Sequence, residues 1–531
     1  MDNEHRREKR RRRIGNLQHI EDLTPRKIKK KMVKFRWALA SFSNQEKSQS
    51  DNQSATGSST SIAQSLIARY NKARDKLWKQ ELELAFDADA VDKAPKIEND
   101  AASVVQAIRD EERSRYLKAG ASDHFLANVD LINRGSDLMR VARKLPKGAH
   151  LHCHFNTVLH PSFLVAQARN VKCMFIRSTR SLNVHDNLND AAITFSVLQD
   201  STEGADIFDP NYEPLAWMRY SKFLEDFPGG REQAEEWLVK KLLISLEDAH
   251  AIDQNLEEVW DLFNRRTQMM KGLFNYESAF RNYIGKAIHS FVEDNIMYAE
   301  VRPNFFDKYI VSDDGERQLD HRFDMVGCEG RGNQIRDYLP LLLQFRATCT
   351  NLGLDIPFIF HAGETLESQG PTDNNLYDAI LLDSKRIGHG FAIPQHPLLM
   401  QMCRERGIAL EICPISNEIL HLCPSMKNHV LPILLANAVP CTINSDNPAY
   451  FSSSLSHDFY QTILHIDSIT LHGCRILAEW SIEHSCMDPK QQADAFNTWE
   501  ADWTAFCQWI VLEFGPKYLK SPIAEKANNR N

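Results

Sequence analysis

The sequence predicts an α/β fold made of parallel βαβ units, and three observations support this. From about residue 149, short apolar segments typical of strands alternate with long amphipathic helical segments. The 531 residues exceed one average domain, yet a single β/α barrel with insertions could hold most of them. The apolar segment 356–360, directly before His361, is typical of a strand buried on both faces of a parallel sheet.

Seven segments are predicted as strands of this sheet. They are 149–155, 296–301, 324–327, 356–360, 386–388, 408–413 and 441–445. The polar stretch 171–211 has few helical signals, and we interpret it as an insertion near the start of the barrel. After Asp446 the chain is predicted to be helical almost to its end, with Trp499, Trp503 and Phe506 on one stripe that faces the core.

The chain is predicted to divide into three regions. Residues 1–61 form a basic, Ser-rich disordered tail and linker, residues 62–140 a helical N-terminal extension, and residues 141–520 the barrel domain. Apolar residues recur at roughly helical spacing from Leu66 to Leu84, and a second helical segment covers about 101–117. The basic runs of the tail could direct nuclear import or bind polyanions, or simply be solvated.

The composition is that of an ordinary soluble protein, and it excludes several classes. A formal net charge of −8 gives no general case for nucleic acid, and no apolar run reaches the length of a membrane span. The 11 cysteines include no C-x-x-C pair, which favours reduced thiols, and the basic start of the chain is not followed by the apolar stretch of a signal peptide. We therefore expect a cytoplasmic protein, with nuclear import through the tail left open.

The first candidate site residues are two histidines at the end of a predicted strand. His152 and His154 are two positions apart, so both imidazoles lie on the same face of an extended strand. Such a pair can grip Zn²⁺, whose nitrogen ligands lie about 2.0–2.1 Å from the metal. His361 follows another strand-like segment, and Glu364 comes three residues later. The two side chains are close enough in the sequence for the histidine to bind a metal and the carboxylate to transfer a proton at one site.

Two further side chains follow predicted strands in the same way. His389 lies between two glycines, which let a ligand approach the backbone closely, and Asp446 follows a β-branched segment. In a β/α barrel the carboxyl ends of all strands open on one face, where catalytic groups gather. We therefore expect a metal site and a proton-transfer site to form there from all six of these side chains: His152, His154, His361, Glu364, His389 and Asp446.

These motifs, in the order HxH, HAGE, GHG and SDNP, resemble those of the adenosine deaminase family of metal-dependent hydrolases, which also includes AMP deaminases. The sequence is most similar to the growth-factor-type adenosine deaminases, in stretches such as LPKGAHLHCHF, YAEVRP, FDMVGCEGRG and LEICPISNEIL. The likeness covers about residues 62–515. It implies a (β/α)8 TIM-type barrel of the metal-dependent hydrolase kind, preceded by the helical extension.

The resemblance also implies a role for each matching residue. His152, His154, His361 and Asp446 would bind one catalytic Zn²⁺ per subunit. Glu364 would give a proton to the purine ring, and His389 would orient and deprotonate the attacking water. Gly327 would contact the purine through its backbone, with Glu329 close by. The implied reaction is hydrolytic deamination of adenosine or 2′-deoxyadenosine to the inosine product and ammonia, by attack of zinc-activated water at C6.

Two positions depart from the pattern of the family. An acidic residue that normally serves the ribose is replaced by Asn156, and the second acid of the usual SDDP or TDDP is replaced by Asn447. An acid donates to the purine N7 only when protonated, whereas the amide of Asn447 always carries donors. Both residues are therefore predicted to bind substrate, with the choice of substrate left open.

Several alternatives remain at this point. The same barrel could act on AMP or another 6-aminopurine or amino-heterocycle, or the chain could be a non-catalytic, growth-factor-like binding protein. We expect a small purine nucleoside as partner, no membrane association, and no nucleic acid outside a role of the basic tail. A homodimer through the N-terminal helices stays open. Growth-factor-type deaminases are typically secreted, and this chain would be secreted only if its native start differs.

Overall fold

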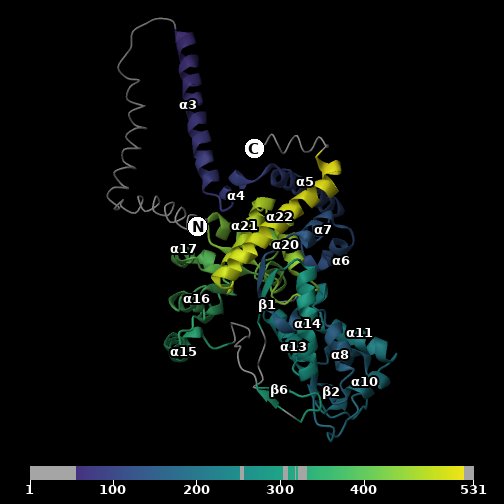
Figure 1. Cartoon of the computed structure of the whole chain (residues 1–531). Coiled ribbons are helices and arrows are strands. Elements are labelled where there is room, and N and C mark those ends of the chain that lie inside the picture. Colours follow the sequence, from purple (N-terminus) through teal and green to yellow (C-terminus); the bar gives the residue numbers. More distant parts are fainter. Residues whose placement is uncertain (1–54, 251–255, 303–308, 317, 321–331, 520–531) are drawn as a thin grey trace. The chain divides into compact units, whose positions relative to one another are not determined.

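The structure is a computed structural model that describes residues 55–250, 256–302, 309–316, 318–320 and 332–519 (Figure 1). The chain divides into two compact units between Glu81 and Leu82. Helix α3 (Ala55–Glu83) makes up the described part of the first unit and extends two residues past its boundary. The domain boundaries predicted at residues 61 and 140 stay predictions.

Four helices open the second unit before its first strand. They are α4 (Ala88–Lys93), α5 (Lys96–Ala119), α6 (Phe125–Gly135) and α7 (Asp137–Lys144). The predicted helical segment 101–117 is confirmed as part of α5, and it buries Val104, Val105 and Ile108 on one face. This spacing of apolar residues is the reason why α5 packs on the domain instead of staying solvated. α5 packs against the long C-terminal helix α22 (Pro489–Tyr518).

Six short parallel strands position the site. They are β1 (Ala149–His154), β5 (Tyr298–Arg302), β8 (Ile359–Ala362), β9 (Arg386–His389), β10 (Ala409–Ile412) and β11 (Cys441–Ile443). β1 pairs with β5, and the other four form one parallel sheet in the order β11-β10-β9-β8. A parallel bridge between Cys153 and Asp446 joins the two sheets. The strand order is therefore β5-β1-β11-β10-β9-β8.

The two ends of this strand order lie close together, so the sheet is curved. Arg302, the last residue of β5, has its Nη1 2.9 Å from Nδ1 of His361 in β8. Within the described residues no strand pairs with both β5 and β8, and the predicted strand 324–327 lies outside them. The α/β class with parallel strands is confirmed, and the curvature brings the carboxyl ends of the strands to one place, as in a β/α barrel.

Six of the seven predicted strands overlap a strand of the structure, but one prediction was wrong in detail. β8 begins at Ile359 instead of Ile356, so His361 lies within the strand and not after it. The prediction that this segment is buried on both faces was also wrong, because Ile356 is 49% exposed and β8 is only partly buried before Ala362. Among the described residues β8 pairs only with β9, so it lacks the second neighbour that a fully buried strand has.

The region 171–211 contains more structure than its polar composition predicted. β2 (Met174–Ser178) pairs antiparallel with β3 (Ile193–Val197) and with β4 (Met218–Arg219). β2 buries three consecutive apolar residues, Met174 to Ile176, whereas β3 alternates buried and partly buried residues, and polar residues surround both strands. A second antiparallel pair joins β6 (Tyr309–Val311) to β7 (Gln318–Asp320).

The remaining helices cover the strands or connect them. From α8 to α17 these are α8 (Ser162–Ala168), α9 (His185–Asp190), α10 (Tyr220–Asp226), α11 (Arg231–Leu242), α12 (Leu246–His250), α13 (Leu256–Phe274), α14 (Glu277–Glu293), α15 (Leu339–Asn351), α16 (Pro371–Leu381) and α17 (Pro397–Arg406). From α18 to α21 they are α18 (Pro414–Ile419), α19 (Leu431–Ala436), α20 (Leu455–His465) and α21 (Leu471–Glu483). Single 3-10 turns lie at η2 (Phe155–Thr157), η4 (Ile335–Tyr338), η5 (Ile393–Gln395) and η6 (Met426–Asn428).

The aromatic stripe of α22 is buried, as the sequence predicted. Trp499 and Trp503 are each 1% exposed, and their rings stack with centroids 5.2 Å apart. The Trp499 indole also donates a hydrogen bond to the carbonyl of Pro146, 2.8 Å away, just before β1. Replacing one such buried Trp by Ala costs about 3–5 kcal/mol, so this contact fixes the start of the strand that carries the histidine pair.

Two further observations concern the cysteines and the helices of the described residues. All ten cysteines within the described residues are free thiols, nine of them buried. Within the same residues, no helix combines the length and the apolar character that crossing a membrane requires. The cytoplasmic location stays a prediction.

Candidate functional site

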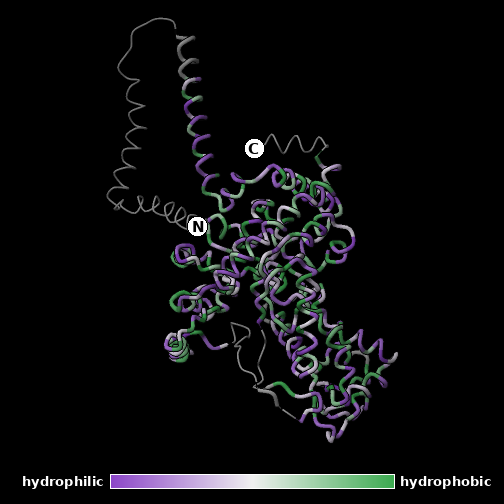
Figure 2. Tube along the Cα trace, viewed as in Figure 1, coloured by the Kyte–Doolittle hydropathy of each residue, from purple (hydrophilic) through white to green (hydrophobic). Residues whose placement is uncertain are grey.

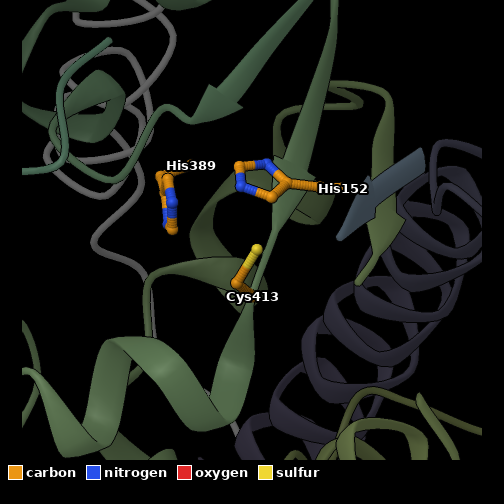
Figure 3. A group of neighbouring side chains, drawn as sticks. All are labelled: His152, His389 and Cys413. Atoms are coloured by element: carbon orange, nitrogen blue, oxygen red, sulfur yellow. The ribbon is translucent and has the colours of Figure 1, made fainter. Parts of the chain in front are cut away.

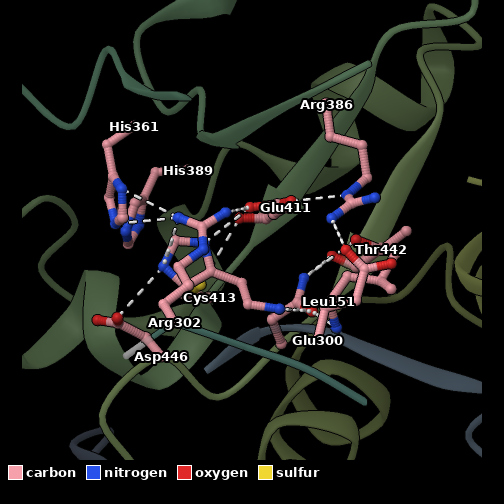
Figure 4. Close-up of polar contacts among 12 residues, drawn as sticks. Leu151, Glu300, Arg302, His361, Arg386, His389, Glu411, Cys413, Thr442 and Asp446 are labelled. Atoms are coloured by element: carbon pink, nitrogen blue, oxygen red, sulfur yellow. Dashed lines mark hydrogen bonds and ion pairs between the residues drawn. The ribbon is translucent and has the colours of Figure 1, made fainter. Parts of the chain in front are cut away.

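The structure brings together all four side chains that the sequence predicts as metal ligands. His152 and His154 come from β1. His361 comes from β8 and Asp446 from the turn after β11 (Figure 4). One ring nitrogen from each of the three histidines lies within 4.8 Å of the others. Asp446 Oδ1 lies 3.3 Å from His152 Nε2 and 3.1 Å from His154 Nε2. These separations suit donor atoms arranged around one small cation.

The buried carboxylate of Asp446 is held in place by its other oxygen. Ser416 Oγ donates a hydrogen bond to Oδ2 at 2.7 Å, and the backbone N–H of Asp446 donates to the carbonyl of His152 at 3.1 Å. Oδ1 is buried and, within the described residues, accepts no hydrogen bond of normal geometry. Although burial opposes ionisation, the nearby His152 and His154 hold the pKa of Asp446 well below its usual range. A buried carboxylate oxygen in this situation favours a cation beside it.

The orientation of His152 is set by a carboxylate behind it. Glu411 in β10 accepts a hydrogen bond from His152 Nδ1 at 2.9 Å, which turns Nε2 of the ring toward Asp446. A cation bound between this nitrogen and the Asp446 carboxylate would be stabilised by both groups. A carboxylate that fixes the tautomer of a ligating histidine in this way is the usual support of a protein metal site.

Two arginines flank the Glu411 carboxylate that hydrogen-bonds to His152. Arg302 and Arg386 both donate to Glu411, and Arg386 also pairs with Glu300 (Figure 4). Burial alone would raise the pKa of Glu411, but the two guanidinium groups hold it well below its usual range. Arg302 Nη1 also lies 3.5 Å from His152 Nε2. Together with burial, this guanidinium keeps the pKa of His361 well below its ordinary value, so the ring is neutral and its lone pair can bind a cation.

The backbone at the site adopts an uncommon conformation at two functional residues. His389 and Asp446 have φ angles of 58° and 56°, in the left-handed region that few residues other than glycine adopt. Gly388 pairs in register with His361 on one side and Glu411 on the other. A Cβ atom at Gly388 would lie 3.1 Å from both Arg302 Nη1 and His152 Cε1. The glycine is therefore needed for the close approach of these strands.

The two predicted proton-transfer residues lie beside the ligand set. His389 Nε2 is 3.5 Å from Glu364 Oε1, and both groups are buried. Together with Asp446 they form another group whose ligand atoms all lie within 4.8 Å of one another. Figure 3 shows that the thiol of Cys413 lies near His389 and His152, which makes it a further donor in reach of the site. Burial raises the pKa of this thiol well above its ordinary value, so it stays neutral and is a poor metal ligand.

The predicted substrate contacts are only partly described. Asn447 is 5% exposed and follows Asp446 directly, and the Thr157 hydroxyl donates to its amide oxygen at 3.4 Å. This contact uses the oxygen, so the NH₂ end of Asn447 is the part that can donate to a purine nitrogen. Asn156 is buried in η2, next to the hydroxyl of Tyr450. Gly327 and Glu329 lie outside the described residues.

Sequence reasoning missed the residues that support the site. The stretches LEICPISNEIL and YAEVRP contain three of these residues, Glu411, Ser416 and Arg302, but the sequence alone indicated no role for them. Asn444 was also missed, although its side-chain oxygen accepts hydrogen bonds from the backbone of Leu151 and His152 at 2.9 and 3.0 Å. For Glu411 and Asn444 the available signal was a charged or amide residue within an otherwise apolar predicted strand, since such a residue needs a buried partner. Arg302 and Ser416 lie outside the predicted strands and gave no such signal.

Comparison with known proteins identifies relatives of the chain. Residues 340–498 match the family profile of adenosine deaminase. The chain is 27% identical to adenosine deaminase 2 of Sus scrofa over 476 residues, which cover 78% of this chain and 89% of the relative. It is also 27% identical to adenosine deaminase 2 of Homo sapiens, over 74% of this chain and 84% of the relative. An adenosine deaminase of the sand fly Phlebotomus duboscqi shows 27% identity over 76% of this chain and 86% of the relative.

Two solved structures are also similar. One is an adenine deaminase from Arthrobacter aurescens, with 17% identity, a TM-score of 0.39, and coverage of 67% of this chain and 98% of that chain. The other is an Arabidopsis N6-mAMP deaminase, with 14% identity, a TM-score of 0.43, and coverage of 68% and 99%. The sequence relatives and the family profile confirm the resemblance that the four motifs indicate.

Proposed function

We propose that this chain deaminates adenosine or 2′-deoxyadenosine to the inosine product and ammonia. The proposal builds on its similarity to adenosine deaminases, which are hydrolases that act on C–N bonds. One observation carries the proposal: two buried imidazoles, one partly buried imidazole and one buried carboxylate converge from β1, β8 and the turn after β11, with Glu364 and His389 beside them. Neither a binding protein nor a structural protein needs this combination of groups.

The donor set fits a zinc ion. His152, His154, His361 and Asp446 would hold it, since neutral imidazoles and a carboxylate are the usual ligands of catalytic zinc. The orphaned Oδ1 of Asp446 and the Glu411 carboxylate behind His152 support this assignment. When bound, zinc would lower the pKa of a coordinated water to about 7.

Glu364 and His389, which lie beside the proposed metal ligands, would transfer protons and orient the water. The Glu364 carboxyl gives a proton to the ring nitrogen next to C6 while the oxygen of water adds at C6. Of the two protons that this oxygen loses, one goes to the amino group, which leaves as ammonia, and the other restores the Glu364 carboxyl. Glu364 suits this role because its side chain is only 6% exposed, so solvent does not compete for the proton. His389 orients the water, and the amide of Asn447 donates to the purine.

AMP as substrate is the second candidate, and Asn156 is the observation that favours testing it. This residue is uncharged where the resemblance leads us to expect an acid near the ribose. An acid at that place would repel a 5′-phosphate, whereas an amide would not. The same substitution weakens the case for tight binding of the nucleoside.

The test is a substrate panel with the full-length protein loaded with zinc. Loss of ultraviolet absorbance and release of ammonia would be followed for adenosine, 2′-deoxyadenosine, AMP and adenine. The proposal expects turnover of the nucleosides at rates well above that of AMP. Faster turnover of AMP would move the assignment to the nucleotide, and no ammonia from any of the four would favour a binding protein.

A further inference from the structure

His429 is a buried histidine to which the mechanism above gives no role. It lies between η6 and α19, is 3% exposed, and packs against the edge of the Phe391 ring. The backbone N–H of Leu431 donates to its Nδ1 at 3.0 Å. A backbone N–H can only donate, so Nδ1 carries no proton. Burial lowers the pKa of His429 to about 3, so the ring is neutral and its single proton lies on Nε2.

The proton of His429 fixes the orientation of a neighbouring amide. His429 Nε2 is 3.1 Å from Oδ1 of Asn417 in α18, and the N–H must donate to that oxygen. The NH₂ end of Asn417 therefore points the other way. The helix backbone holds Asn417 firmly, because its N–H donates to the carbonyl of Cys413 and its own carbonyl accepts from Leu422 at 2.9 Å.

The amide of Asn417 in turn fixes His389. Asn417 Nδ2 lies 3.2 Å from His389 Nδ1, and an amide NH₂ can only donate. Nδ1 of His389 is therefore an acceptor, and the proton of the neutral ring lies on Nε2. That nitrogen faces Glu364, with its Oε1 3.5 Å away. Each step follows from the one before, and the first is fixed by a backbone N–H.

We propose that His429 and Asn417 are positioning residues that hold His389 in its Nε2–H form, so that His389 meets the attacking water as a hydrogen-bond donor and not as a base. The catalytic part of this inference rests on the proposed function, whereas the proton positions do not. A base at Nε2 would need its lone pair there, with the proton on Nδ1. The NH₂ of Asn417 would then face an N–H, and turning the amide round would place it against the N–H of His429 instead.

The direct test is neutron diffraction from crystals of the full-length protein grown in D₂O. The proposal expects deuterium on Nε2 and none on Nδ1 in both His429 and His389. Deuterium on Nδ1 of His389 would overturn it, whether or not the protein deaminates adenosine. Conversely, a protein with the expected proton positions that fails to deaminate purines would sink the proposed function and leave this arrangement standing.

A matched pair of variants tests the consequence for catalysis. Asn417→Asp keeps the size of the side chain and still accepts from His429, but it replaces the donor at His389 Nδ1 by an acceptor. We expect kcat to fall about 10- to 100-fold with KM little changed, and the deuterium of His389 to move to Nδ1. Asn374→Asp makes the same chemical change at an exposed position of α16 and should leave the kinetics unaltered. An Asn417→Asp enzyme that keeps its kcat would contradict the donor role of His389.

Discussion

Glu364 is the residue on which the proposed proton transfer depends. Its carboxyl is buried beside His389 and is not one of the four proposed metal ligands. Glu364→Gln keeps the shape of the side chain but removes the transferable proton, so we predict that kcat falls about 10²- to 10⁴-fold while metal content is retained. Steady-state kinetics with metal analysis of the same sample checks this. Glu367→Gln, an exposed change three residues away, is the control, and near-normal turnover of Glu364→Gln would remove the role of that residue.

Asn447 is predicted to recognise the purine through a permanent donor. Asn447→Asp replaces this donor by a group that donates only when protonated, so kcat/KM for adenosine should fall increasingly as the pH rises. The measurement compares adenosine with 7-deazaadenosine, which lacks the N7 acceptor, across a pH series. We predict that the wild type prefers adenosine and that the variant loses this preference at the upper end of the series. Equal preference in both proteins would show that Asn447 does not contact N7.

At the scale of elements, α18 is tied to the N-terminal helices by a histidine and a carboxylate. His124, just before α6, has its Nδ1 3.0 Å from Oε1 of the buried Glu418, and its ring stacks on His250 with centroids 3.8 Å apart. The hydrogen bond to Glu418 raises the pKa of His124 above 6.5, despite partial burial. Because the raised pKa belongs to the folded state, the stabilisation is fully present below pH 6.5 and is lost as the pH rises through the folded pKa.

The corresponding experiment follows thermal unfolding of the wild type and of His124→Gln over a pH series. We predict that the wild type is the more stable protein at mildly acidic pH and that the difference shrinks toward alkaline pH. His160→Gln serves as the control, because this partly exposed histidine has a pKa that burial lowers, and its nearest polar partner is Ser162 instead of a carboxylate. A stability difference that grows with pH would contradict the assignment.

Some strands of the structure could be predicted from the sequence, whereas others could not. The strands that carry His152, His389 and Asp446 were found from short apolar runs that end in a polar residue, because the buried sheet demands that pattern. The start of β8 was misplaced, since the apolar run 356–360 extends beyond the residues that pair with β9. β2 and β3 were missed because both are short and polar residues surround their apolar residues, which are consecutive in β2 and alternate in β3.

Sequence patterns are local, which explains why the supporting residues of the site could not be predicted. A metal ligand can be found from its place after a strand, whereas its support depends on contacts between distant segments. Glu411 supports His152 from 259 positions away, and Asn417 supports His389 from α18. Such pairs depend on how strands and helices are arranged in space, which no local pattern encodes. No pattern in the sequence distinguishes His429 from an ordinary structural histidine.

At the scale of the whole molecule, helix α3 suggests how chains associate. Most of α3 is hydrophilic in Figure 2, yet Leu66, Tyr70 and Leu77 are exposed at spacings of four and seven residues. Tyr70 is 68% and Leu77 66% exposed, which leaves an apolar stripe of the kind that pairs two helices. We predict that the full-length chain is a homodimer through this helix.

Sedimentation of the full-length protein tests this prediction. Leu77→Glu should shift the equilibrium to monomers, because it places a charge in the apolar stripe. Gln64→Glu adds the same charge to the opposite, exposed face of α3 and should leave the dimer intact. A wild type that sediments as a monomer at all accessible concentrations would contradict the prediction.

The proposed activity depends on one metal ion held by four side chains that are distant in the sequence. This site can be tested with diffraction data collected on both sides of the zinc absorption edge, from crystals of the zinc-loaded protein. We predict one anomalous peak per chain among His152, His154, His361 and Asp446. His361→Ala should lose this peak, together with the stabilisation that zinc gives to the wild type. Zinc bound elsewhere, or full zinc content in His361→Ala, would show that these side chains do not hold the metal.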